Sequence, residues 1–170
     1  MGSEMCIRDR SLFGDPLFRW RETFLVVFDE SNRPTTESVK QALARVGKFD
    51  AEQCNQTETG LIESLTVTNS IDCVGLDIVF VDGEEASEQI EELRSEISPD
   101  DLLPGQEEML EQLAGCNARL DILHFEQLTA SFSEDDDDEF LDPGSLLGVA
   151  EALAQLVGGV AVDPGSGTFV

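Results

Sequence analysis

The sequence predicts a single α+β domain whose mainly antiparallel sheet is covered by helices on both faces. Three observations support this fold class. The segments TFLVVF, LDIVFV and LDILHF are apolar at nearly every position, so we expect both faces of their strands to be buried. Amphipathic helical stripes separate these strands. Finally, 41% of the 170 residues are hydrophobic, which is enough for a packed core.

The first half of the chain is expected to form a strand, a helix and three further strands. Residues 22–30 are a short apolar run ending in turn-forming residues, which is typical of a strand. Thr35 is suited to cap a helix over residues 36–46, where apolar residues recur on one face. Residues 51–70 then form two extended segments around a turn, and residues 75–85 contain the clearest strand.

The second half is expected to add three helices and the rest of the sheet. Residues 85–97 and 106–114 have helical periodicity, and residues 118–128 form another apolar strand. A helix over residues 143–157 begins with Pro at its first position, and residues 159–170 form a strand, a turn and a short strand. The first part of this order resembles a ferredoxin-like split β-α-β arrangement, to which a C-terminal helix and a β-hairpin are added.

The apolar strands require cover on both faces of the sheet. We expect the helices over residues 36–46 and 85–97 to cover one face, and the helix over residues 143–157 to cover the other. A dimer partner is the competing cover for that second face. The apolar stripe of the last helix favours the intramolecular solution, and therefore a monomer over a homodimer.

Charge is distributed unevenly along the chain. The formal net charge is −26, and residues 49–170 contain 29 acidic residues but only two basic ones. Such a surface repels phosphate, so direct nucleic-acid binding is not expected, whereas a basic protein partner is compatible with it. Adaptation to a salty habitat, or simple solubility, is the favoured explanation of the acidity itself.

An acidic run, Glu134–Glu139, lies in a predicted loop over residues 131–142. Calcium loops require oxygen ligands at spaced positions around a sharp turn, and this run contains no glycine. A solvated loop is therefore favoured, while weak divalent-cation binding and contact with a basic partner stay open. The residues that would contact such a partner are Asp135, Asp136, Asp137 and Asp138.

Candidate catalytic side chains are few. His124 is the only histidine and shares a strand face with Glu126, so this pair is suited to orient a nucleophile such as Ser64 or Cys73. A carboxylate cluster is the second candidate, because such a cluster holds Mg²⁺ or acts as a general acid and base. Acids at the start of a helix, or a structural histidine, explain the same residues without chemistry. The cluster comprises Asp77, Asp82, Glu84, Glu85 and Asp121.

A basic end precedes the first strand. Trp20 lies between Arg19 and Arg21, and Trp and Arg are the residue types most enriched at binding hot spots. This triplet is therefore a candidate partner-binding edge. The alternative is that Trp20 packs on the rim of the sheet and the arginines offset local acid.

The first ten residues do not fit the fold. The string SEMCIRDR resembles translated sequencing-adapter sequence, so we expect residues 1–17 to be a non-native or disordered extension and residues 18–170 to form the domain. The four cysteines form no C-x-x-C pair, which favours free thiols and a cytoplasmic location.

The segments FRWRETFLVVFDESNRPT, GLIESLTV, LDILHFE and GGVAVDPGSGTFV resemble a set of uncharacterised bacterial proteins. That resemblance implies a bacterial single-domain protein and no particular activity. We therefore expect a non-enzymatic domain that acts through protein contacts and requires no cofactor. A metal-assisted hydrolase built on the carboxylates and His124 is the alternative.

Overall fold

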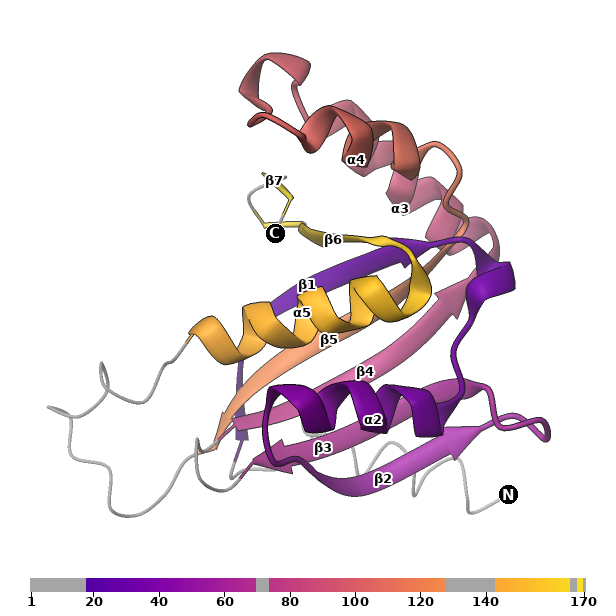
Figure 1. Cartoon of the computed structure of the whole chain (residues 1–170), viewed down its shortest axis with the longest axis vertical. Helices are drawn as coiled ribbons and strands as arrows, with labels where there is room; N and C mark the ends of the chain where they lie inside the picture. The colour runs from indigo at the N-terminus through magenta and orange to yellow at the C-terminus, as the bar shows by residue number, and fades with distance from the viewer. Residues whose placement is uncertain (1–17, 70–73, 128–142, 166–167, 170) are drawn as a thin grey trace, which may run out of the picture.

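The computed structural model describes residues 18–69, 74–127, 143–165 and 168–169, which form helices packed on one sheet (Figure 1). Within these ranges the sheet has seven strands in the order β2-β3-β4-β5-β1-β6-β7, and each neighbouring pair is antiparallel. The predicted α+β class with a mainly antiparallel sheet is therefore confirmed. The strands are β1 (Phe18–Phe28), β2 (Asp50–Gln56), β3 (Ile62–Asn69), β4 (Val74–Asp82), β5 (Ala118–Gln127), β6 (Val160–Asp163) and β7 (Thr168–Phe169). The helices are η2 (Glu30–Asn32), α2 (Thr36–Val46), α3 (Gly83–Glu96), η3 (Pro99–Asp101), α4 (Gln106–Leu113) and α5 (Pro143–Val157).

Helix α2 illustrates how local sequence sets the elements. The Thr35 hydroxyl accepts a hydrogen bond from the Ser38 N–H, as expected of an N-cap, and Glu37 lies in the first turn. Val39 and Leu43 are buried on the side that faces the sheet. The predicted cap, stripe and boundaries of this helix are all confirmed.

A split β-α-β unit is present, but different elements form it. Strands β5 and β6 both run antiparallel to β1, which lies between them, and α5 connects β5 to β6. We expected the first part of the chain to form this unit and the last helix to be an addition. Instead α5 belongs to the split unit, whereas α3 and α4 are inserted between the neighbouring strands β4 and β5. The likeness of the whole domain to a ferredoxin-like fold stays a prediction.

Both faces of the sheet carry helices, but the predicted pairing of helices was wrong. Helices α2 and α5 lie side by side on one face, and α3 and α4 pack on the other (Figure 1). The connections from β1 to β2 and from β5 to β6 each join strands that run in the same direction. Crossovers of this kind are right-handed. The two start from antiparallel strands and run in opposite directions along the sheet. These two reversals cancel, so right-handedness places both helices on the same face. No such rule constrains α3 and α4, which join adjacent antiparallel strands.

Alternation along the strands divides the core into two layers. Phe24, Val26 and Phe28 of β1 point to the face covered by α2 and α5, whereas Leu25 and Val27 point to the face covered by α3 and α4. Both sets are buried, so the expectation that the apolar strands need cover on each side is confirmed.

The turn from α5 into β6 depends on two glycines. Gly158 has a φ of 63°, a left-handed conformation that ends the helix. Gly159 lies directly on β1, where an added Cβ would overlap the Val27 carbonyl oxygen and lie 2.8 Å from the Phe28 Cβ. A glycine at this position allows β6 to approach and pair with β1.

Candidate functional site

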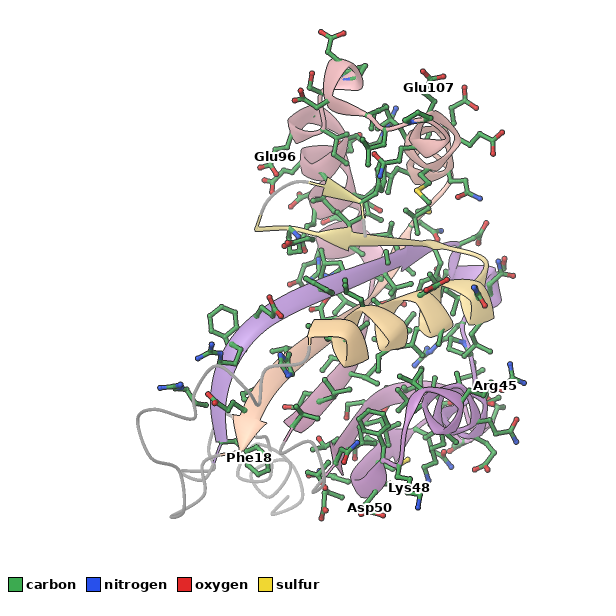
Figure 2. All side chains as sticks on the ribbon, turned by 60° about the vertical axis from the view of Figure 1, so that its left-hand side comes forward. Phe18, Arg45, Lys48, Asp50, Glu96 and Glu107 are labelled. Atoms are coloured by element: carbon green, nitrogen blue, oxygen red, sulfur yellow. The ribbon has the colours of Figure 1, made fainter. Side chains whose placement is uncertain are left out.

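The most pronounced charged surface among the described residues is formed by α3, η3 and α4, which we call the acidic helical pair. It extends beyond the sheet and presents eleven exposed carboxylates and one exposed guanidinium, that of Arg94. Figure 2 shows Glu96 and Glu107 pointing away from the rest of the molecule. The carboxylates are those of Glu84, Glu85, Glu88, Glu91, Glu92, Glu96, Asp100, Asp101, Glu107, Glu108 and Glu111.

Local physics explains why this acidic stretch is helical despite its charge. Ile90 and Leu93 of α3 and Leu113 of α4 are buried against the sheet side of the pair. Six of the acids lie in first turns, where the partial positive charge of the helix N-terminus stabilises them. The apolar stripe therefore anchors the helices, and the carboxylates are left on the outside.

The outer surface of the pair is not uniformly polar. Leu103, in the connection between η3 and α4, is 64% exposed. A shallow hollow of about 390 Å³ between the helices is lined by Glu91, Arg94, Ser95 and Leu110. Carboxylates around an apolar contact suit a partner that carries lysine or arginine next to an aliphatic side chain.

Sequence reasoning missed this surface and concentrated on a different one. The predicted acidic loop over residues 131–142, including Asp135, Asp136, Asp137 and Asp138, lies outside the described residues, as does the N-terminal segment 1–17. A count of charge along the chain would have found the pair, because residues 83–113 contain eleven acids and one base. The acids of the run are adjacent in the sequence, whereas those of α3 and α4 are spaced along the helices and form no continuous motif.

A second group of charges surrounds the buried carboxylate of Glu126, which lies between β1 and β5. The Glu126 side chain is only 5% exposed, and one of its oxygens accepts hydrogen bonds from Arg19 at 2.7 Å and Arg21 at 3.5 Å. A buried carboxylate is strongly unfavourable without such partners. These two predicted partner-binding arginines therefore contact the domain's own Glu126, as the alternative explanation of the basic end requires.

His124 is buried beside this ion pair. Its Nδ1 lies 3.8 Å from the Glu22 carboxylate, which is too far for a hydrogen bond, and Nδ1 has no other partner among the described residues. Burial lowers the pKa of His124 below its ordinary value, the positive charge of Arg21 lowers it further, and Glu126 acts in the opposite direction. The imidazole is therefore neutral near pH 7.

Trp20 lies on β1, between the two arginines that contact Glu126. Its indole is 48% exposed, and its N–H donates a hydrogen bond to the Thr23 hydroxyl at 3.0 Å. The side chain is thus accessible, and the triplet lies within β1 and not before the first strand as expected.

The predicted carboxylate cluster is divided between places that do not converge. Asp77 is buried and accepts a hydrogen bond from Thr66, while Asp121 binds Arg119 at 2.7 Å. Both lie on the opposite face of the sheet from His124 and Glu126, because alternate residues of paired strands point to opposite sides. Burial raises the pKa of Asp121, and the adjacent Arg119 opposes that shift.

The remaining members of that cluster form a helix start. Asp82 ends β4, and Glu84 and Glu85 lie in the first turn of α3, with Glu85 also 3.7 Å from Arg119. The interpretation of these acids as a strand-to-helix turn is confirmed. Ser64 lies on the face opposite His124 and contacts Asn55, so the two do not form a nucleophile pair. Cys73 lies outside the described residues.

Within the described ranges, no three His, Cys, Asp or Glu residues are arranged to hold a metal ion. None of the described helices is long and apolar enough to cross a bilayer. No family model, curated protein or solved structure matches this chain.

Proposed function

We propose that this protein is a non-enzymatic α+β domain that binds a basic protein partner through the acidic helical pair. Eleven exposed carboxylates against one exposed arginine on α3, η3 and α4 are the observation that carries the proposal. Carboxylates fixed on rigid helices keep their spacing without further ordering, so less entropy is lost on binding than with a flexible acidic chain.

A protein partner fits this surface better than a nucleic acid does. The net negative charge of the pair would repel phosphate, whereas lysine and arginine side chains would be attracted and their association accelerated. Leu103 and Leu110 add an apolar contact that a basic peptide segment with aliphatic neighbours would bury. The two described cysteines, Cys54 and Cys116, are free thiols, which supports a location in the reducing cytoplasm.

The test compares two sets of neutralised carboxylates that change the net charge equally. The first variant carries Glu88→Gln, Glu92→Gln and Glu96→Gln on α3. The matched control carries Glu52→Gln, Glu58→Gln and Glu63→Gln, which are exposed on β2, β3 and their connecting turn. A lysine- and arginine-rich peptide is titrated into each by calorimetry at about 0.05 M and about 0.3 M salt.

We expect the α3 variant to lose about tenfold in affinity for the peptide, and the control to change less than about twofold. Binding of the unaltered chain should weaken as salt is raised. Equal losses of affinity in the two variants would mean that peptide binding depends only on the net charge of the protein. The acidic helical pair would then not be a binding site, and the proposal would be withdrawn.

A further inference from the structure

The outward side of α5 is unusually apolar for a surface helix. Leu147 and Leu156 are 42% and 38% exposed, and Glu151 is the only charged residue between Pro143 and Val157. The opposite side of the helix already supplies the core with Leu146, Val149, Ala150, Leu153 and Val157. Leu147 and Leu156 are thus not part of the hydrophobic core of the domain.

An open hollow follows each side of this helix. One, of about 550 Å³, lies between α2 and α5 and includes Arg45 and Leu156. The other, of about 590 Å³, lies between α5, β6 and α4 and includes Leu147. Glu151 and Gln155 line both hollows, so α5 forms an apolar ridge between two depressions.

The charge on this face differs from that on the rest of the molecule. Helices α2 and α5 together carry two acids, Glu37 and Glu151, and two bases, Lys40 and Arg45. Two copies of a chain with a net charge of −26 repel each other in most orientations, and that repulsion is smallest where the approaching faces are neutral. We call this surface, formed by α2 and α5, the neutral face.

Arg45 and Glu151 are complementary charges on the neutral face. They line the same hollow, and neither is part of an ion pair within the described residues. Figure 2 shows Arg45 at the end of α2, directed away from the sheet. In a two-fold contact each surface meets its own copy, so Arg45 of one chain would face Glu151 of the other, twice.

We propose that the neutral face binds a second copy of the chain across a two-fold axis. The α5 ridge of each copy, about 22 Å long, enters the hollow beside α5 of the other and buries Leu147 and Leu156. Two reciprocal Arg45–Glu151 pairs fix the register of the contact. The intramolecular cover of the sheet that favoured a monomer is still satisfied, because this contact uses only the outer side of α5.

Sedimentation equilibrium of the full chain over a range of concentrations tests the contact. The unaltered chain should dimerise reversibly, and Leu147→Gln with Leu156→Gln should weaken dimerisation about tenfold or more. The matched control is Leu103→Gln, which replaces a more exposed leucine on the other face of the sheet and should change dimerisation less than about twofold. A chain that stays monomeric at the highest concentration, or an equal effect of the control, would overturn the proposal.

Charge reversal supplies a second, independent measurement. Arg45→Glu alone and Glu151→Arg alone should each weaken self-association, because each places like charges opposite one another twice. An equimolar mixture of the two variants should regain it, since both pairs in the mixed dimer are again opposite in sign. Absence of this rescue would contradict the two-fold contact. The α3 carboxylate variants described above should leave dimerisation intact, so the failure of one proposal is distinguishable from the failure of the other.

Discussion

Gly159 offers a direct test of how the last helix is joined to the sheet. A Cβ at this position would overlap the Val27 carbonyl oxygen and lie 2.8 Å from the Phe28 Cβ. Non-bonded carbon atoms prefer about 3.5–4.0 Å, so Gly159→Ala requires a displacement of about 1 Å between β6 and β1. The obstructing atoms are mainly backbone atoms in the middle of the sheet, and these do not move independently.

Overpacking of this kind costs about 1–3 kcal/mol of unfolding free energy. In a chain of this size each kcal/mol corresponds to about 2–4 °C in Tm, so we expect Gly159→Ala to lower Tm by about 2–12 °C. Urea unfolding followed by circular dichroism measures the same quantity as a shift in midpoint with little change in slope.

The control for this substitution is Gly115→Ala. A Cβ there would meet only the Gln112 carbonyl oxygen at 3.8 Å, which is an ordinary contact. We expect a change within about 0.5 kcal/mol for this surface position. If both variants are equally stable, β6 does not approach β1 as closely as described, and the reasoning about the α5–β6 turn is refuted.

Two further predictions concern titratable groups. Because the folded protein lowers the pKa of His124 from its ordinary 6.5, the stability that the neutral imidazole contributes is full above that value and is lost as pH falls through the folded pKa. Urea unfolding at about pH 7.5 and about pH 5.5 should therefore show a larger loss for the unaltered chain than for His124→Gln, and equal losses would contradict it. Burial, assisted by Asp29, raises the pKa of the Cys116 thiol to about 11, so at about pH 8 iodoacetamide should modify Cys116 more slowly than the exposed Cys54. Peptide mass spectrometry separates the two sites, and faster labelling of Cys116 would show that its thiol is not shielded.

Elements with a strong local signal were predictable. The Thr35 cap, the Val39 and Leu43 stripe and the apolar strand centred on Ile122 required only neighbouring residues. The α+β class followed from the same observations, because strands that are apolar on both sides must be covered twice.

The placement of the helices depended on connections that the sequence does not display. Whether the helix over residues 143–157 joins α2 or faces it across the sheet depends on which strand β6 pairs with. That pairing, of Leu25 with Val162, joins residues far apart in the chain. Without it, the crossover rule that places α5 beside α2 cannot be applied.

The ion pairs around Glu126 were not predictable for a related reason. Arg19 and Glu126 are separated by 107 positions, and the strand register shifts between Trp20 and Glu22. Such an irregularity changes the phase of alternation, so extrapolation of a two-residue period does not place Arg19 beside Glu126. Only the face shared by His124 and Glu126, on one regular strand, was accessible from spacing.

The position of β1 has a consequence for how this molecule is made. The first described strand, Phe18–Phe28, lies in the interior of the sheet, yet both of its neighbours, Ala118–Gln127 and Val160–Asp163, are translated long after it. The apolar residues of β1 therefore have no native partner strand during most of translation. Exposed apolar segments of this kind are prone to aggregation and to chaperone binding. Formation of the native sheet should consequently be slow for a chain of this length, and the hairpins of Asp50–Asp82 should be ordered before β1 is inserted.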